Sequence, residues 1–323
     1  MYAGAFAALI DGVHRVAVRG RYAPSPTGRL HLGNARTALV AWLQTRALGG
    51  AFVMRVEDVD FGRSRPEHQA RQLQDLRWLG LDWDEGPDVG GPYGPYVQSQ
   101  RGAHYEAAVA ELATFRCSCT RKQLREAAGI DAGEEPVYPG TCRDGPTDPN
   151  RPLAIRWRID SLSEARIEGV DEVFGSVADT LATDVGDFVL RRGDGAWAYQ
   201  LAVVVDDAAM QITHVCRGAD LLSSVPRQIA LQRALGLPAV AYAHVPIVVG
   251  PDGAKLSKRH GAPDLSALRE SGADARRVVA VLARSLGLVT DAVTHVAAAE
   301  LVADFDMQRI RPGAGDVLDP ADL

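Results

Sequence analysis

Three residues at the start of a predicted helix carry groups that suit a phosphate. His31, Gly33 and Asn34 follow the turn 23–28, whose two prolines end the strand predicted before it. A strand, a glycine-bearing turn and a helix N-terminus bring free backbone amides and the positive end of the helix dipole to one point. The side chains of His31 and Asn34 add donors there. The pattern predicts an anion site, although taken alone it also fits a plain strand-to-helix turn.

A second basic stretch lies far downstream. Lys255 and Lys258 belong to the run 255–259, Lys-Leu-Ser-Lys-Arg, and the chain has one further lysine, Lys122, among its 35 lysines and arginines. A compact, mobile ammonium suits a triphosphate whose charge changes during a reaction. Taken alone, the run also fits an exposed basic loop. Together with residues 31–34 it predicts a site for nucleotide phosphates.

Three cysteines and a tyrosine form another group of interest. Cys117 and Cys119 make a Cys-x-Cys pair, and Tyr138 and Cys142 follow a polar stretch with poor hydrophobic periodicity. A metal would hold such loops together, and three thiolates suit tetrahedral Zn²⁺. Tyr138 is an unusual fourth ligand, because its phenol, with an ordinary pKa of about 10, must lose a proton. The alternative is three free thiols with Tyr138 packed beside them, whereas Cys216 is predicted to be a buried core residue.

The elements that must position these groups alternate between strand and helix. A strand that follows the apolar residues 16–18 and ends at 21–22, and a second strand at 51–60, are expected on either side of a helix that ends at Gly49. The acids at the end of the second strand lie where α/β sheets bind ligands. The continuous apolar run 201–205 predicts a strand that is covered on both faces. We also expect strands at 154–159, 212–215 and 245–249, a hairpin at 186–199, and helices at 66–79, 99–114, 224–235, 265–270, 273–286 and 292–301.

The overall composition sets limits on the class of protein. A chain of 323 residues with 46% hydrophobic residues suggests about two domains and a sizeable core. The net charge of −6 is unusual for a nucleic-acid binder but leaves local basic patches open. No apolar run reaches the roughly 18 residues of a membrane span, and no basic region precedes the apolar residues 3–10, as it would in a signal peptide. We expect a cytoplasmic monomer without a membrane partner, whose first 18 residues are an N-terminal extension.

Two motifs resemble the signatures of class I aminoacyl-tRNA synthetases. The run 24–34, Pro-Ser-Pro-Thr-Gly-Arg-Leu-His-Leu-Gly-Asn, resembles their first ATP signature in its glutamyl form, with Asn34 in place of a second histidine, and 255–259 resembles the second signature. The resemblance implies a Rossmann-type parallel sheet. It also implies that ATP, with Mg²⁺, is bound by His31, Gly33, Asn34, Lys255 and Lys258. Catalytic roles fall to His31 and Asn34, which hold phosphates, and to Lys258, which neutralises the leaving pyrophosphate.

The same resemblance points to glutamate as the amino acid. Glutamate has two carboxylates and one ammonium, so its site needs two cations and one anion. Five residues match the glutamate-binding positions of the glutamyl branch: Arg21, Ser25, Glu57, Tyr199 and Arg217. Each of the three charged residues lies next to a predicted strand end. Which arginine takes which carboxylate stays open, and Glu57 taken alone also fits a carboxylate that caps a turn.

Within that branch the chain most resembles a truncated paralogue, the glutamyl-queuosine tRNA(Asp) synthetases. The chain ends soon after Lys258, and the cluster Cys117, Cys119, Tyr138 and Cys142 is similar to the zinc ligands of that family. The run 199–207 also resembles that family, because Val203 stands where full-length enzymes usually have Asn. The resemblance implies ATP-dependent activation of L-glutamate and its transfer to the queuosine base in the anticodon of tRNA(Asp). Alternatives are a minimal glutamyl-tRNA synthetase that charges the tRNA 3′ end, and a non-catalytic regulator that binds ATP or RNA.

This resemblance also implies a domain organisation. The catalytic domain is expected in two halves, 19–114 and 153–262, separated by a zinc-binding insertion at 115–152. A short helical C-terminal domain is expected at 263–323, without the anticodon-reading region of full-length glutamyl enzymes.

Overall fold

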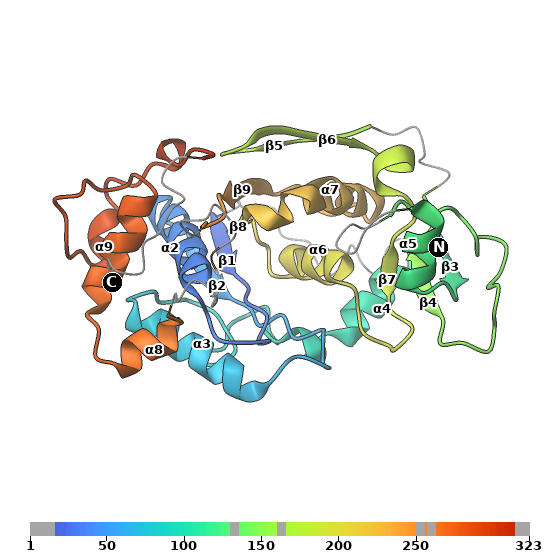
Figure 1. Ribbon diagram of the computed structural model, residues 1–323, viewed down its shortest axis with the longest axis horizontal. Helices are drawn as coiled ribbons and strands as arrows, with labels where there is room; N and C mark the ends of the chain where they lie inside the picture. The colour runs from blue at the N-terminus through green and yellow to red at the C-terminus, as the bar shows by residue number, and fades with distance from the viewer. Residues whose placement is uncertain (1–16, 130–135, 160–165, 250–255, 257–262, 314–323) are drawn as a thin grey trace.

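The computed structural model of the chain describes residues 17–129, 136–159, 166–249, 256 and 263–313. Three regions follow one another along the long axis in Figure 1. The C-terminal helices lie at one end, a six-stranded sheet with its helices lies in the middle, and a small three-stranded sheet lies at the other end. Among the described helices, none is long and apolar enough to cross a membrane.

The central sheet is mostly parallel, as predicted. Its strand order is β2 (Ala51–Met54), β1 (Arg19–Tyr22), β8 (His214–Gly218), β9 (Ala241–Val245), β5 (Arg166–Asp171) and β6 (Gly175–Thr180). Neighbouring strands run parallel except for β5 and β6, which form an antiparallel hairpin. The carboxyl ends of β1, β2 and β8 therefore meet at one edge of the sheet, where ligands bind in α/β folds. The predicted α/β class is confirmed.

Helices cover this sheet and connect it to the C-terminal region. Helix α2 (Leu32–Ala47) contacts β1 and β8, and α9 (Ala275–Ser285) packs on α2. Helices α6 (Tyr199–Ala209) and α7 (Val225–Ala234) pack together, and α7 contacts the β5–β6 hairpin, which runs above it in Figure 1. Helix α3 (Pro66–Trp78) contacts α8 (Leu265–Glu270). These contacts fix α2 and β8 firmly beside the edge that carries the site.

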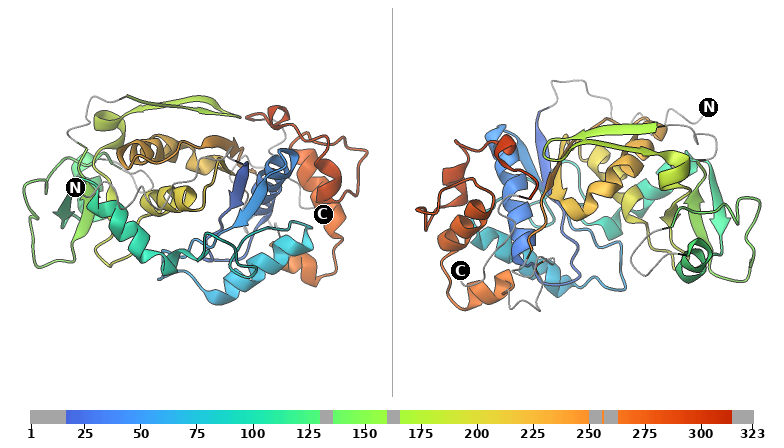
Figure 2. Two further views of the ribbon diagram at one scale, coloured as in Figure 1. Left: turned by 180° about the vertical axis from the view of Figure 1, so that it is seen from behind. Right: turned by 45° about the horizontal axis from the view of Figure 1, so that its top comes forward.

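The small sheet is antiparallel, with the order β3 (Thr114–Cys117), β4 (Ala154–Trp157) and β7 (Val189–Arg191). Helix α4 (Gly102–Ala110) leads into β3, and α5 (Arg121–Ala128) follows it. The other views show the small sheet and α5 at the far end from the C-terminal helices (Figure 2). The predicted hairpin is present in a shorter form: Arg191 and Trp197 form an antiparallel bridge, and the amides of Arg192 and Ala198 donate to the carbonyls of Ala196 and Leu190.

The predicted strand at 201–205 is wrong, because these residues belong to helix α6. Every side chain from Leu201 to Val205 is at most 2% exposed. A helix that is buried on all sides reads as a continuous apolar run, which periodicity cannot distinguish from a buried strand. Burial in the core here overrides the weak helix propensity of three consecutive valines.

Three other expectations fail at element ends. The strand expected at 245–249 ends at Val245, because Pro246 has no amide to donate to the sheet; the strand runs instead through Ala241–Val245. The helix expected at 292–301 is limited to a 3₁₀ turn, Ala298–Leu301, and the amide of Val296 donates to the carbonyl of Arg276 instead. The helix expected at 99–114 stops at Ala110, since Thr114 already begins β3.

Candidate active site

A cavity of about 610 Å³ opens at the carboxyl edge of the central sheet, next to the N-terminus of α2. Its lining includes all of the predicted glutamate- and ATP-binding residues that the structure describes: Arg21, Ser25, His31, Gly33, Asn34, Glu57, Tyr199 and Arg217. Lys255 and Lys258 lie outside the described residues. The structure thus brings together residues that come from both halves of the sequence.

The phosphate-binding end of the cavity is built by the first turn of α2. His31 is the N-cap, and its Nδ1 accepts a hydrogen bond from the Asn34 amide at 3.3 Å, while the Asn34 Oδ1 accepts from the His31 amide at 3.1 Å. This reciprocal capping box fixes both side chains. A Cβ at Gly33 would lie 3.0 Å from the His31 ring, so glycine leaves room for the imidazole. The side chain of Asn34 therefore acts first as a cap through its oxygen, and its side-chain nitrogen Nδ2 can still donate to a ligand.

A network of buried charges includes two residues of the cavity lining, Arg21 and Glu57. Arg55 is fully buried and binds Glu57 at 2.9 Å and Asp207 at 2.7 Å. Arg21 shares Asp207, with its Nε 3.3 Å from the same carboxylate oxygen, and its Nη1 donates to the Cys216 carbonyl. Two arginines and two carboxylates therefore form a nearly balanced group beneath the cavity.

Burial affects the two carboxylates in different ways. Burial raises the pKa of Glu57, and the nearby Arg55 and Arg21 offset this only in part. Burial also opposes ionisation of Asp207, but Arg21 and Arg55 together hold its pKa below the ordinary value. Asp207 is thus a fixed negative charge, whereas Glu57 is the carboxylate that can respond to a ligand.

Arg217 is held by four partners. Its Nη1 donates to the Tyr199 hydroxyl at 3.1 Å and to Gln228 Oε1 at 2.8 Å, its Nη2 donates to the Leu221 carbonyl, and its Nε donates to His244 Nε2 at 2.9 Å. Because the Tyr199 oxygen accepts from Arg217, the hydroxyl hydrogen of Tyr199 can be donated to a ligand. Arg217 and Tyr199 therefore present a cation and a donor to the same cavity.

The residues that support this site carry little signal in the sequence. Arg55, Asp207, His244 and Asp171 were not predicted to play a part in it. Arg55 carried one usable signal, since residues 55 and 57 lie on one face of an extended segment. Asp207 gives no signal because the apolar run before it predicts a strand, whereas the structure has helix α6 there. His244 and Asp171 are 73 positions apart, and no local pattern relates them.

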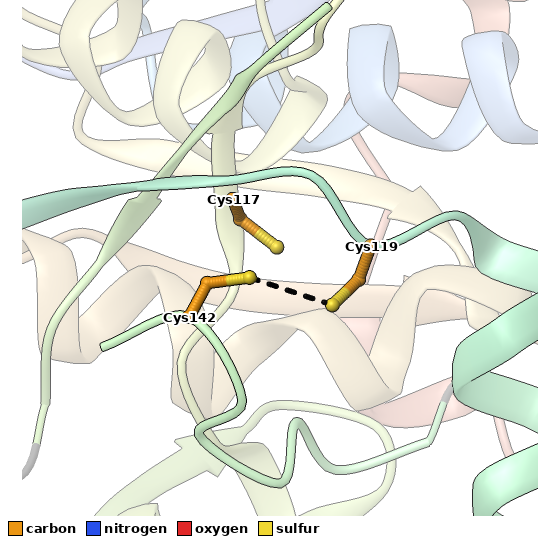
Figure 3. Close-up of side chains that lie close together, drawn as sticks. All are labelled: Cys117, Cys119 and Cys142. Atoms are coloured by element: carbon orange, nitrogen blue, oxygen red, sulfur yellow. Dashed lines mark hydrogen bonds between the residues drawn. The ribbon is translucent and has the colours of Figure 1, made fainter. Parts of the chain in front are cut away.

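The predicted metal ligands also lie close together. The three sulfur atoms of Cys117, Cys119 and Cys142 lie within 4.8 Å of one another, and Figure 3 shows them pointing toward a common centre. The Cys119 and Cys142 sulfurs are 3.6 Å apart, and the Tyr138 hydroxyl is 3.4 Å from Cys117 Sγ and 3.7 Å from Cys119 Sγ. Cys216 is buried in β8, as predicted.

The protonation of this cluster is uneven. Burial opposes ionisation of Cys142, but hydrogen bonds from the Thr147 amide, the Tyr138 hydroxyl and the Ser118 amide lower its pKa to about 5. Burial raises the pKa of Cys119 to about 11, and burial likewise raises the pKa of Tyr138. Cys142 is therefore the thiol of this cluster that its hydrogen-bond partners favour as a thiolate.

Comparison with known families decides the class of this protein. The family described as "tRNA synthetases class I (E and Q), catalytic domain" matches residues 17–312. The chain belongs to this class I synthetase family. The match covers both walls of the cavity and the cysteine cluster, so the predicted family and its α/β fold are confirmed.

Several curated members of the family are similar over almost the whole chain. A Glutamyl-Q tRNA(Asp) synthetase of Symbiobacterium thermophilum is 50% identical over 302 residues, which cover 90% of this chain and 93% of the relative. One of Deinococcus radiodurans is 51% identical over 276 residues, 84% of this chain and 90% of the relative. The predicted resemblance to this group of class I enzymes is confirmed.

Full-length glutamate enzymes of the family are also similar. A glutamate–tRNA ligase of Anaeromyxobacter sp. (strain K) is 44% identical over 304 residues, which cover 92% of this chain but 63% of the relative. The structure also resembles the crystal structure of a glutamate tRNA ligase from Elizabethkingia meningosepticum in complex with its amino acid, with a TM-score of 0.81 and 28% identity. The superposition covers 94% of this chain and 68% of that one. The named relatives are all ligases, as expected for an enzyme of this class.

Proposed function

We propose that the chain activates L-glutamate with ATP to glutamyl-adenylate and transfers the glutamyl group to the queuosine base of tRNA(Asp). One observation carries the glutamate assignment: Arg21, Glu57 and Arg217 line the same cavity, next to the capped start of α2. Two cations and one anion complement the two carboxylates and the ammonium of glutamate. The arginines come from β1 and β8.

The proposed reaction needs alignment and charge stabilisation more than covalent help. A glutamate carboxylate oxygen attacks the α-phosphorus of ATP, the bond to the β-phosphate oxygen breaks, and pyrophosphate leaves. We assign Arg21 and Arg217 to the substrate carboxylates, Glu57 to the ammonium, and Ser25 and Tyr199 to hydrogen bonds. His31, Gly33 and Asn34 hold phosphates at the start of α2, and Lys255 and Lys258 neutralise the leaving group. Mg²⁺ would accompany the ATP.

The acceptor is proposed from the relatives. Those named Glutamyl-Q tRNA(Asp) synthetase are 47–51% identical and match this chain over about nine-tenths of their own length. The glutamate–tRNA ligases share 43–44% identity and extend well beyond the matched part. The higher identity to the first group favours the queuosine base over the 3′ hydroxyl as acceptor.

An acceptor assay tests the proposal directly. The chain is incubated with ¹⁴C-glutamate, ATP and Mg²⁺, in parallel with tRNA(Asp) that bears queuosine, tRNA(Asp) that bears guanosine at the same position, and tRNA(Glu). We expect label on the first tRNA alone, in the anticodon fragment after nuclease digestion. Label at the 3′ end of tRNA(Glu) would identify a minimal glutamyl-tRNA synthetase. Absence of label and of glutamate-dependent ATP–pyrophosphate exchange, with tRNA present, would refute an activating enzyme.

The raised pKa of Glu57 predicts an acid limb in the pH profile. The substrate ammonium requires an ionised Glu57, so activity is kept above the pKa of this carboxyl and lost as the pH falls through it. Because burial raises that pKa, we expect kcat/KM for glutamate to decline at a pH above the ordinary 4.5. Glu57→Gln should remove this limb and lower kcat/KM about tenfold or more. Asp58→Asn is the control, because the carboxylate of Asp58 accepts a hydrogen bond from the Ser99 amide instead. Loss of the acid limb in Asp58→Asn would contradict the assignment.

We also propose that the cysteine cluster binds Zn²⁺. With Zn–S bonds of about 2.3 Å, tetrahedral ligand sulfurs are roughly 3.8 Å apart, close to the 3.6 Å between Cys119 and Cys142. The Tyr138 oxygen lies at a similar distance from two sulfurs, which supports Tyr138 as the fourth donor. The residues therefore fit this ion, which would tie β3 to the loop that carries Cys142. The site would define a zinc-bearing insertion at 115–152 between the halves of the catalytic domain.

Removal of one ligand should reduce the zinc content. Cys119→Ser is expected to lower the zinc-to-protein ratio from about one to well below one half, because a neutral hydroxyl is a poor substitute for a thiolate. Elemental analysis by plasma mass spectrometry after gel filtration measures the ratio. Cys216→Ala, a change outside the cluster, should leave it unaltered. An unchanged ratio in Cys119→Ser would count against the assignment.

A further inference from the structure

A histidine and an aspartate lie directly behind Arg217, outside the residues assigned above. His244 on β9 is fully buried, and its Nε2 lies 2.9 Å from Arg217 Nε. Its Nδ1 lies 2.6 Å from a carboxylate oxygen of Asp171, which ends β5 and is also buried. The three side chains therefore form a row across three neighbouring strands of the sheet, β8, β9 and β5.

This geometry fixes the tautomer of His244. Arg217 Nε always carries a hydrogen and can only donate, so His244 Nε2 must be unprotonated and accept. The single hydrogen of the neutral ring then lies on Nδ1 and is donated to Asp171. Burial and the adjacent Arg217 lower the pKa of His244, although Asp171 opposes this shift. The neutral ring is therefore the stable form at physiological pH.

Asp171 is itself held in place. One of its oxygens accepts from the amides of Val173 and Phe174, in the turn of the β5–β6 hairpin, at 3.0 and 2.9 Å. Burial opposes its ionisation, yet the bond from His244 and these amides lower the pKa of Asp171 below the ordinary value. The carboxylate is ionised and can only accept, so Asp171 and Arg217 together place the hydrogen of His244 on Nδ1.

A neutral partner has a clear consequence for Arg217. Among the described residues, the bonds of Arg217 are to a phenol, an amide, a carbonyl and an imidazole, and none is to a carboxylate. Arg21, in contrast, shares Asp207 with Arg55. The imidazole orients the Arg217 guanidinium without neutralising it, and this leaves its charge for a ligand.

We propose that His244 and Asp171 are positioning residues that hold Arg217 in the geometry required to bind a carboxylate of the amino-acid substrate. The inference rests on the proposed glutamate-activating function. The charged groups that face His244 are Asp171 from β5, Arg217 from β8 and Arg21 from β1, and Tyr242 stacks beside it on β9. Protonation of His244 would place a second cation against Arg217 and remove its acceptor.

The test compares two substitutions of His244 in ATP–pyrophosphate exchange with tRNA present. His244→Leu removes the acceptor, and we expect the KM for glutamate to rise about tenfold, with kcat and the KM for ATP within about twofold of the unsubstituted chain. His244→Gln keeps an oxygen in reach of Arg217 and should recover most of the loss. His214→Leu, on β8 at the end remote from Arg217, is the matched control and should leave the KM for glutamate unchanged.

A second measurement does not depend on turnover. The measurement is the NMR spectrum of ¹⁵N-histidine-labelled protein at pH 8, in which the resonances absent from the His244→Gln spectrum identify His244. Their ¹⁵N chemical shifts should show the Nδ1–H tautomer. Asp171→Asn should shift the population toward Nε2–H. An Nε2–H ring or an imidazolium in the unsubstituted chain would overturn the inference. So would a wild-type KM for glutamate in His244→Leu, or equal increases in both KM values. Absence of exchange in the unsubstituted chain would instead refute the proposed function, and this inference with it.

Discussion

Arg21→Leu should lower kcat/KM for glutamate by about 100-fold or more while the protein stays folded. A buried charged hydrogen bond to a ligand is worth about 2–5 kcal/mol, which corresponds to roughly 30- to 4,000-fold. We expect the fold to tolerate the change, because Asp207, the carboxylate that Arg21 contacts, keeps its shorter bond to Arg55 at 2.7 Å. Glutamate-dependent ATP–pyrophosphate exchange, with glutamate varied at saturating ATP, measures the effect.

Arg19→Leu provides the matched control for this loss. Arg19 lies two residues earlier on the same strand and is also ion-paired, to Glu85 at 2.8 Å, but it is not part of the cavity lining. We expect its kcat/KM to stay within about threefold of the unsubstituted chain. Equal losses in both variants would mean that β1 has been disturbed as a whole. A normal kcat/KM in Arg21→Leu would remove Arg21 from the substrate site.

The position of the charged residues could be predicted because it follows from local sequence. Arg21, Glu57 and Arg217 each stand at or just beyond the end of an apolar, β-favouring run, and the ends of parallel strands meet at one edge of a sheet. The helix that starts after His31 has its glycine and its cap within four residues. Local signals of this kind were sufficient to place both halves of the cavity lining.

The support behind these residues could not be predicted, because it depends on contacts that are distant in sequence. Arg55 and Asp207 are 152 positions apart, and His244 and Asp171 are 73 apart. The mistaken strand at 201–205 has a related cause: an interior helix loses the polar face that would reveal its period. Once that segment forms α6, Tyr199 and Asp207 lie two turns apart on one helix and both reach the site.

Arg55→Leu should have the largest effect on stability, with a loss of about 3–5 kcal/mol in the free energy of unfolding. Arg55 is fully buried and is the shared cation of Glu57, Asp207 and Asp206, at 2.9, 2.7 and 4.0 Å. Removal of one partner from a buried ion pair leaves uncompensated charge, which is far more costly than loss of a surface pair. Urea unfolding followed by tryptophan fluorescence measures the change. Arg46→Leu, which breaks pairs with the exposed Asp82 and Asp84, should cost about 1 kcal/mol or less.

The pH dependence of this loss of stability in Arg55→Leu distinguishes an unpaired buried charge from lost packing. Burial already raises the pKa of Glu57 in the intact chain, and removal of Arg55 takes away the cation that opposes this shift most strongly. A carboxyl whose folded pKa is raised above its unfolded value stabilises the fold at low pH, and this contribution is lost as the pH rises through the folded pKa. The deficit of Arg55→Leu should therefore be smaller at pH 5 than at pH 8, and Glu57→Leu in the same chain should restore part of it. A deficit that is equal at both pH values, and unchanged by the second substitution, would show that Arg55 acts through packing alone.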